Sequence, residues 1–361
     1  MDTRISKLAK LLIRYSIEAK KGQTIAVSGG PLAEPLLTSV YEELLKVGAF
    51  PVIQMVPDGL SECFFKVGKE HHFNTVTPYQ RAWARNVDAT INVYSEKNTR
   101  ALTNVNPAKQ AKVAKARKPL LDILKKKPWT LTLFPTEAYA QDAEMSLAEF
   151  EDFVYGAMFL DRDNPIVAWN SLSRKQDRLI SSLKGADKVQ IVGPGTDISF
   201  SVKGRSFVNS NGKHNMPSGE IFSGPVENSV EGEIEFDFPV CWAGREIDGV
   251  RLVFRKGKVV EATAEKNQKF LRTMLSIDAG ASRIGEFGIG TNMGIQKFVK
   301  TILFDEKIGG TIHLALGRSL HGTGGKNKSA LHWDMIKDLR KGGAIYIDGK
   351  VFQKDGKFKV R

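Results

Sequence analysis

The spacing of apolar residues predicts alternating helices and strands over the first half of the chain. At the N-terminus, apolar side chains recur every three or four positions, which predicts a helix with one buried face. Short apolar runs bounded by glycine or polar residues predict buried strands between the helices. We expect strands over residues 22–30, 51–55, 87–93 and 129–134, and helices over residues 5–15, 31–50 and 147–159. This alternation is typical of a mostly parallel α/β sheet.

The pattern changes near residue 185, after which strands follow strands. Residues 251–262 predict a hairpin that turns at Lys256 and Gly257. A helix is expected over residues 265–279, and two Asp-Gly pairs near the C-terminus predict further hairpin turns. The second half of the chain is therefore expected to be rich in β-structure.

The length of 361 residues corresponds to about two domains. We predict an α/β fold class: a mostly parallel α/β domain over residues 1–185, followed by a β-rich α+β domain over residues 186–361. With 42% hydrophobic and 26% charged residues, the composition excludes a largely disordered chain.

Cysteine usage and hydropathy exclude several classes of protein. The two cysteines, Cys63 and Cys241, are far apart, which excludes a disulfide framework and a cysteine-rich zinc module. Basic residues interrupt the apolar positions of the N-terminal segment, and no run of about 18 apolar residues exists. We therefore expect neither a signal peptide nor a membrane span, and a cytoplasmic protein.

The net charge of +13 raises the hypothesis of a nucleic-acid-binding protein. Lysines recur every three residues over residues 108–118, at Lys109, Lys112, Lys115 and Lys118, a spacing that also fits a solvated helix face. Aromatic residues do not interleave with these lysines, and no nucleic-acid-binding motif accompanies them. We therefore expect no nucleic-acid partner and keep this function as an alternative.

Motifs of several enzyme classes are missing or incomplete. The sequence contains neither HExxH nor GxSxG. Residues 322–329 resemble a phosphate-binding loop, but Leu320 and Asn327 occupy the positions where that loop needs Gly and Ser or Thr. Residues 285–294 have glycines at the wrong spacing for a dinucleotide-binding fingerprint, and we expect a turn-rich loop there.

Histidines gather near the C-terminus. Residues 330–336 predict a strand, in which His332 and Asp334 share one face because side chains alternate. His313 lies among apolar residues of another predicted strand. An imidazole and a carboxylate two positions apart on a strand are suited to bind one metal ion or two adjacent ions.

Carboxylates accompany these histidines in unusual surroundings. Glu220 and Glu286 are isolated among small and apolar residues, where a buried carboxylate is costly unless it is paired or bound to metal. Asp305 and Glu306 come just before the strand of His313. Each residue taken singly also fits a structural role, so the hypothesis of a metal site depends on their joint occurrence.

At these residues the chain resembles the M29 metallo-aminopeptidases, the aminopeptidase T/S group. Segments 215–225 (NMPSGEIFSGP), 285–288 (GEFG), 303–317 and 329–336 are similar to the ligand-bearing segments of the family, in the same order. The resemblance extends over nearly the whole chain and makes residues 186–361 the catalytic metal-binding domain. It implies the metal ligands Glu220, Glu286, Glu306, His313, His332 and Asp334.

The resemblance implies a metallo-exopeptidase, a hydrolase that removes the N-terminal residue from peptides with a free N-terminus. Four carboxylates and two imidazoles suit two divalent ions such as Zn²⁺, Co²⁺ or Mn²⁺. Glu286 is the first choice for the bridging ligand and Asp334 the second. We expect a metal-activated water to attack the scissile carbonyl, and Glu220 or Glu286 to carry the proton to the leaving amine. The family also implies a homodimer.

One position departs from the family, which has a tyrosine at the active site seven residues beyond the histidine that corresponds to His313. Here that position is Leu320, and His321 is the candidate replacement as donor to the oxyanion. An inactive relative that keeps the fold is one alternative. A ring-cleaving, non-haem iron dioxygenase of related fold is another, in which His313, His332 and Asp334 form the iron-binding triad.

Overall fold

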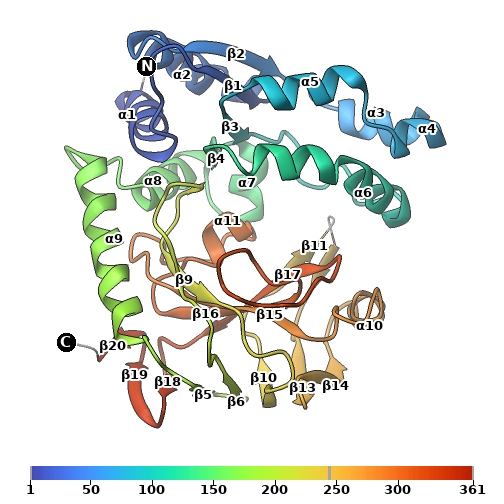
Figure 1. Cartoon of the computed structure of the whole chain (residues 1–361), viewed down its shortest axis with the longest axis vertical. Helices are drawn as coiled ribbons and strands as arrows, with labels where there is room; N and C mark the ends of the chain where they lie inside the picture. The colour runs from blue at the N-terminus through green and yellow to red at the C-terminus, as the bar shows by residue number, and fades with distance from the viewer. Residues whose placement is uncertain (1, 243–244, 360–361) are drawn as a thin grey trace. The chain divides into compact units, whose positions relative to one another are not determined.

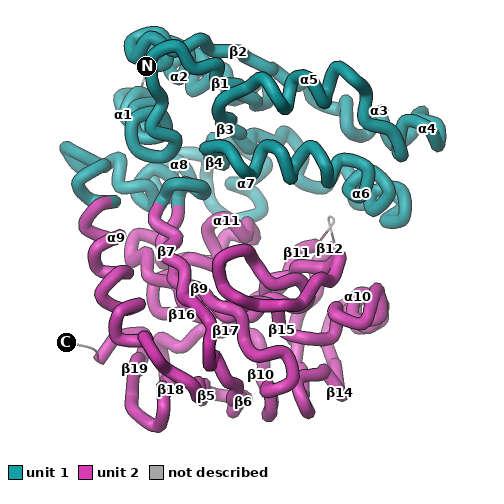
Figure 2. Tube along the Cα trace, in the orientation of Figure 1, with its two compact units in different colours: residues 1–169, 212–217 teal, residues 170–211, 218–361 magenta. Residues whose placement is uncertain are grey.

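The computed structural model describes residues 2–242 and 245–359. The chain forms two compact units (Figure 2), each with its own sheets. Unit 1 contains residues 1–169 and 212–217, and unit 2 contains residues 170–211 and 218–361. The predicted boundary between residues 185 and 186 follows the end of helix α9 (Pro165–Ser182), whereas the two units divide within this helix, after Trp169.

Unit 1 is built on a five-stranded parallel sheet with the order β2-β1-β3-β4-β8 (Figure 1). Its strands are β1 (Thr24–Gly29), β2 (Phe50–Met55), β3 (Ala89–Tyr94), β4 (Trp129–Leu133) and β8 (Asn215–Met216). Its helices are α1 (Thr3–Leu11), α2 (Glu34–Lys46), α3 (Leu60–Val67), α4 (Glu70–Asn74), α5 (Pro78–Asn86), α6 (Pro107–Leu124), α7 (Glu137–Asp142) and α8 (Leu147–Ala157), with a π-helical turn at Leu12–Ser16 and a 3-10 turn at Pro31–Ala33. The predicted parallel α/β sheet is confirmed.

The apolar runs of unit 1 explain why its central strands pair in parallel. Ile25 and Val27 of β1 and Ile91 of β3 are completely buried. A strand that is covered on both faces has a nearly continuous run of apolar residues in its sequence. Such runs are typical of parallel sheets flanked by helices. The apolar stripe of α2, which includes Leu36 and Leu44, is buried as well, and this helix contacts β1 and β2.

Unit 2 is antiparallel, as its predicted hairpins require. An eight-stranded sheet has the order β14-β13-β10-β6-β5-β18-β19-β20, a five-stranded sheet has the order β17-β16-β15-β9-β7, and β11 pairs with β12. The strands are β5 (Lys188–Gly193), β6 (Thr196–Ser201), β7 (Val208–Ser210), β9 (Glu220–Ser223), β10 (Glu231–Glu235), β11 (Val240–Trp242), β12 (Arg245–Ile247), β13 (Arg251–Arg255), β14 (Lys258–Thr263), β15 (Ile284–Gly290), β16 (Thr311–Gly317), β17 (His332–Asp338), β18 (Ala344–Ile347), β19 (Lys350–Lys354) and β20 (Lys357–Phe358). The helices of this unit are α10 (Gln268–Leu275), α11 (Ile302–Asp305) and the part of α9 after Trp169.

In unit 2, one face of the five-stranded sheet β17-β16-β15-β9-β7 packs against the eight-stranded sheet. Buried side chains of both sheets form one hydrophobic cluster, and Phe200 of β6 contacts Phe287 of β15 edge to face, with ring centroids 5.1 Å apart. Leu314 and Trp333 join this core from β16 and β17. Because side chains alternate along a strand, residues between these apolar positions point to the opposite face.

Two predicted elements differ from the structure. The helix expected over residues 265–279 is shorter: α10 spans Gln268–Leu275, after a left-handed Asn267 with φ of 60°. The prediction of a turn-rich loop over residues 285–294 is wrong for the first half of this segment, because residues up to Gly290 belong to β15. Its glycines do not mark turns there but allow neighbouring groups to approach closely; a Cβ at Gly290 would lie 2.0 Å from the Ile308 carbonyl oxygen.

None of the helices in the described part of the chain combines the length and hydropathy that a transmembrane segment needs.

Candidate metal centre

Five of the six predicted ligands lie on one face of the five-stranded sheet of unit 2. This face is turned away from the core, and we call it the ligand face. They are Glu220 on β9, Glu286 on β15, His313 on β16, and His332 and Asp334 on β17. The sixth, Glu306, follows α11 directly and lies one short turn before β16. The segments that looked separate in the sequence therefore meet because their strands are neighbours.

Small residues occupy the ligand face between these side chains. Across the strand pairs, Glu220 is opposite Gly290, His313 is opposite Gly288, Asp334 is opposite Ala315, and His332 is opposite Gly317. A Cβ built on Gly288 would lie only 2.0 Å from Cε1 of His313. The glycine therefore leaves the space that this imidazole occupies over the strand.

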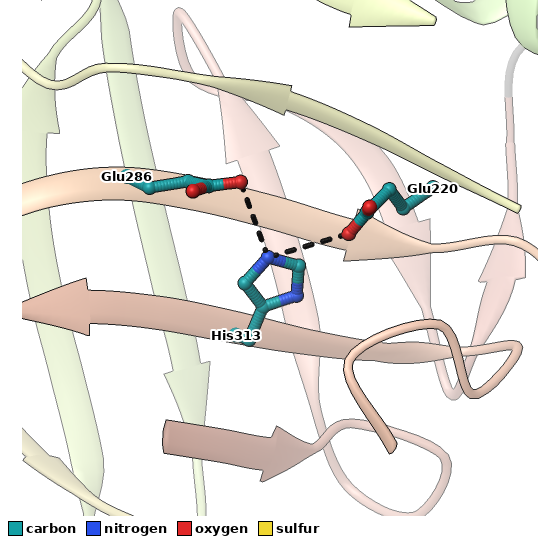
Figure 3. A group of neighbouring side chains, drawn as sticks. All are labelled: Glu220, Glu286 and His313. Carbon is teal, nitrogen blue, oxygen red and sulfur yellow. Dashed lines mark ion pairs between the residues drawn. The ribbon is translucent and has the colours of Figure 1, made fainter. Parts of the chain in front are cut away.

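A first ligand group consists of Glu220, Glu286 and His313 (Figure 3). Nε2 of His313 lies 3.4 Å from Oε2 of Glu220 and 3.5 Å from Oε1 of Glu286. Figure 3 shows the imidazole of His313 pointing from its strand toward both carboxylates. All three side chains are almost completely buried, with 6%, 3% and 1% of their surface exposed.

A second group consists of Glu286, His332 and Asp334. Nε2 of His332 lies 3.2 Å from Oε2 of Glu286 and 3.7 Å from Oδ2 of Asp334. Glu286 thus directs one oxygen toward each histidine. A third group joins Glu306, His313 and Asp334, so Asp334 also belongs to two groups. The side chains of His332 and Asp334 are 18% and 12% exposed, so solvent reaches the cluster from this side.

Both histidines are oriented by the same kind of contact. Nδ1 of His313 donates a hydrogen bond to the backbone carbonyl of Glu306 at 3.0 Å, and Nδ1 of His332 donates one to the carbonyl of Arg318 at 2.7 Å. Since a carbonyl oxygen only accepts, each Nδ1 carries the proton. This arrangement leaves each Nε2 available as a ligand atom, and it is the usual support of a metal-binding histidine.

The electrostatics of the cluster favour positive charge at its centre. Burial raises the pKa of Glu220 above its usual range. Burial acts in the same sense on Glu286, but contacts with the imidazoles of His313 and His332 outweigh it and lower the pKa of Glu286. Burial by itself lowers the pKa of an imidazole, yet the adjacent carboxylates raise the pKa of both histidines. In the metal-free chain, protons on the imidazoles therefore balance the carboxylates.

The donor atoms fit divalent ions. Buried side-chain atoms without a hydrogen-bond partner include Glu220 Oε2, Glu286 Oε2, His313 Nε2 and Asp334 Oδ1. Native proteins rarely leave such atoms unsatisfied, and here they converge on one cluster. Carboxylate oxygens together with imidazole nitrogens are the ligand set of Zn²⁺, Co²⁺ and Mn²⁺ sites.

Lys307 is a member of the cluster that sequence reasoning missed. Its side chain is completely buried, its Nζ pairs with Glu306, and the same Nζ lies 3.8 Å from Oε1 of Glu220. Burial alone lowers the pKa of a lysine, but the charges of Glu306 and Glu220 raise it, so Lys307 stays charged. In the sequence, residues 305–307 look like an exposed charged turn, and no pattern there signals a buried cation.

His321 is placed differently from the six ligands. It is exposed on the loop of residues 318–331, between β16 and β17, and the neighbouring Leu320 is half-buried on the same loop. Within the described residues, the three ligand groups do not include His321. The structure thus brings together the six predicted metal ligands but not the predicted oxyanion donor.

The family model of the thermophilic metalloproteases (M29) matches residues 1–358. The chain belongs to the M29 metalloprotease family. This confirms the resemblance inferred from the ligand-bearing segments, and with it the prediction that the chain is a metallopeptidase.

Relatives of this M29 protein carry aminopeptidase names. The chain is 26% identical over 351 residues to Aminopeptidase 2 of Geobacillus stearothermophilus. This alignment covers 88% of the present chain and 84% of the relative. It is 26% identical to Aminopeptidase T of Thermus thermophilus (87% and 84% covered) and 24% identical to Aminopeptidase AmpS of Bacillus subtilis (98% and 94% covered).

A solved structure shares the fold. Wild-type AmpT from Thermus thermophilus superposes with a TM-score of 0.86 at 23% identity, and the match covers 99% of each chain. The α/β fold class predicted from the sequence is thereby confirmed.

Proposed function

We propose that this M29 metalloprotease is an aminopeptidase that releases the N-terminal residue of peptides at a centre of two divalent ions. In this proposal Glu220, Glu286 and His313 hold one ion, and Glu286, His332 and Asp334 hold the other. Glu286 would be the ligand shared by the two ions, because it directs one oxygen toward each histidine. Glu306 completes the set beside His313 and Asp334.

The bound ions would supply Lewis-acid activation of a water molecule and of the scissile carbonyl. The residues of the chain prepare this chemistry. The carbonyls of Glu306 and Arg318 fix the two imidazoles, so that the ligand atoms are preorganised. An oxygen of Glu220 that does not bind an ion would be a suitable proton carrier to the leaving amine, because Glu220 lies within the cluster.

The preference for a free N-terminus follows from the open side of the cluster. Oδ1 of Asp334 has no hydrogen-bond partner, and its residue lies where solvent reaches the site. The ion that Asp334 would help to hold could bind the free α-amino group of a substrate, which an acylated N-terminus offers less well. Lys307 holds Glu306 and acts as a positioning residue.

The observation that carries the proposal is the convergence of two backbone-anchored imidazoles on the shared carboxylate of Glu286. The test is to strip the protein with a chelator and restore Zn²⁺, Co²⁺ or Mn²⁺ separately. An unblocked leucyl peptide and its N-acetylated twin are then offered, while bound metal per chain is measured. We expect metal-dependent release of leucine from the unblocked peptide only.

A matched pair of variants locates the activity. Glu286→Gln keeps the shape of the side chain but removes the bridging charge, and we expect it to lose metal and at least about 100-fold in kcat/KM. Glu265→Gln, an exposed glutamate after β14, is the control and should change neither. No cleavage by a protein with two ions bound would refute the aminopeptidase and leave the inactive-relative hypothesis.

The alternatives have less support. A dioxygenase would need His313, His332 and one carboxylate, whereas Glu220 and Glu286 are buried in the same cluster without a use in such a triad. The relatives reported above are named aminopeptidases. Iron content and oxygen uptake of the purified protein would distinguish this alternative.

The nucleic-acid hypothesis rested on the net charge and on the lysines of residues 108–118. They lie on α6, where Lys112 pairs with Glu70 and Lys118 pairs with Asp122. These ion pairs support the interpretation of the lysine run as a solvated face of α6. The cytoplasmic location and the homodimer stay predictions.

A further inference from the structure

A small cavity in unit 2 adjoins the candidate metal centre. Its volume is about 80 Å³. Residues of β11, α11 and β17 contribute to its wall, and the aliphatic and aromatic ones include Val240, Trp242, Phe298, Ile302, Trp333 and Ile336. Asp334, a candidate ligand of the second group, belongs to the same wall. Asp334 is therefore shared by the wall of the cavity and the candidate metal centre.

The position of the cavity matches what an exopeptidase needs. An aminopeptidase holds the α-amine and the first carbonyl of its substrate at the metals, so the side chain of the N-terminal residue must enter the space beside them. Asp334 and Ile336 share one face of β17, since they are two residues apart. A substrate held at Asp334 would thus direct its first side chain along this strand toward Ile336.

The wall of the cavity is chemically suited to an apolar side chain. Phe298 stacks on Phe238 with centroids 4.8 Å apart, and Trp242 is supported from behind by the core residue Trp333, with ring centroids 6.1 Å apart. These contacts hold the aromatic wall in place without the help of a ligand. Burial of aliphatic carbon against such a wall is favourable, at about 25 cal/mol for each Å² of apolar surface.

Two charged residues of the wall, Asp305 and Lys300, are already engaged within the protein, and the third, Asp334, is a candidate metal ligand. Oδ1 of Asp305 accepts a hydrogen bond from the backbone N–H of Val299 at 2.8 Å. Nζ of Lys300 lies 3.8 Å from Oε2 of Glu246. A charged substrate side chain would lose its water without gaining a dedicated partner, which is costly.

We propose that this cavity is the specificity pocket for the N-terminal residue and that it selects aliphatic side chains of the size of leucine or methionine. A cavity of 150 Å³ lined by apolar residues accommodates benzene. The present cavity has about half that volume, so an aromatic side chain fits poorly. This inference rests on the proposed aminopeptidase function and adds its substrate class.

The first test compares substrates on the metal-loaded protein. Peptides that differ only in the first residue (Ala, Leu, Met, Phe, Glu or Lys) are assayed for kcat/KM. We expect Leu and Met to exceed Ala, Phe, Glu and Lys by about tenfold or more, the effect of filling or missing apolar volume in a pocket. Equal rates for Leu, Glu and Lys would overturn the assignment.

Two variants change the cavity in opposite directions. Ile302→Trp adds bulk from a residue that is 47% exposed, and should lower the Leu-to-Ala ratio of kcat/KM about tenfold. Phe298→Ala enlarges the cavity and should raise the Phe-to-Leu ratio about tenfold. Ile277→Trp is the control, because this isoleucine is 49% exposed and is not part of the wall.

A binding measurement makes the result independent of turnover. Calorimetric titration of L-leucine onto the metal-loaded protein should give a Kd about tenfold lower than that of L-glutamate, and Ile302→Trp should abolish the difference. If no peptide is cleaved, the proposed function fails. If peptides are cleaved but Ile302→Trp lowers the rates for Ala and Leu equally, with metal content unchanged, the pocket assignment fails alone.

Discussion

Gly288 allows a direct test of the ligand geometry, because its missing side chain is the space that the His313 imidazole occupies. In Gly288→Ala, the new Cβ would lie 2.0 Å from Cε1 and 2.1 Å from Nε2 of His313. Ordinary contacts between such atoms need at least about 3.4 Å, so the ring must move by more than about 1 Å. The Nδ1 bond to the Glu306 carbonyl, which fixes the ring, would be lost with that movement.

The consequence for metal binding follows from the tolerance of coordination geometry. Metal–ligand distances in functional sites vary by only about 0.2 Å, so a ring displaced by about 1 Å no longer coordinates. Loss of support for one ligand alone costs about 10- to 100-fold in affinity. We therefore expect Gly288→Ala to lower the binding affinity for one of the two ions at least tenfold, which corresponds to about 1.4 kcal/mol. Overpacking should also lower the free energy of unfolding of the metal-free protein by about 1–3 kcal/mol.

The assay is zinc binding by competition with a chromogenic chelator, combined with urea unfolding of the metal-free protein. Gly156→Ala is the control: Gly156 lies inside α8, and a Cβ there would meet nothing within 4 Å. It should raise the free energy of unfolding by up to about 1 kcal/mol without changing zinc affinity. Wild-type zinc affinity and activity in Gly288→Ala would refute the placement of the His313 ring.

Two further predictions concern charge within the cluster. Lys307→Met leaves Glu306 and Glu220 without their buried cation, so urea unfolding of the metal-free chain should show a loss of about 3 kcal/mol. Saturating zinc should restore much of this loss, and unchanged stability of the metal-free variant would contradict the pairing. Because the pKa values of His313 and His332 are raised, the imidazoles are protonated in the metal-free chain at neutral pH and must release protons to bind zinc. Zinc affinity should therefore rise between about pH 6 and about pH 8, by up to tenfold per pH unit for each proton released; calorimetry in two buffers of different ionisation enthalpy measures that number.

The sequence predicted those features that depend on local pattern. The turn at Lys256 and Gly257 follows from two flanking strands and a glycine, which is suited to positive φ, and the structure has φ of 48° and 76° at the two residues. The pairing of His332 and Asp334 on one face follows from the period of a strand alone. Neither feature needs information from distant parts of the chain.

Features that depend on distant neighbours were not predictable. The buried Lys307 lies beside Glu220, which is almost 90 residues earlier in the chain. Residues 212–217 return to unit 1 because β8 pairs with β4, and two residues of strand carry no periodic signal. His321 was assigned from its place in the sequence next to Leu320, but the length and course of its loop decide where its side chain lies.

The segment Gly285–Gly288 shows how one irregularity decides whether this sheet can bind metal at all. Ile284 and Phe287 both join the core, although they are three residues apart, while their partners on β16 are only two apart. The pairing therefore contains a β-bulge between Ile284 and Glu286, which takes up one extra residue. Without it, strict alternation would turn Glu286 into the core, since a slip of one residue exchanges the two faces of a strand. Gly285 makes the bulge possible, because a Cβ there would lie 2.1 Å from the Gly317 carbonyl oxygen. The same four residues thus form the bulge, supply the shared ligand, fill the core and clear the space for His313, which explains why a glycine-rich run that looked like a loop is a strand.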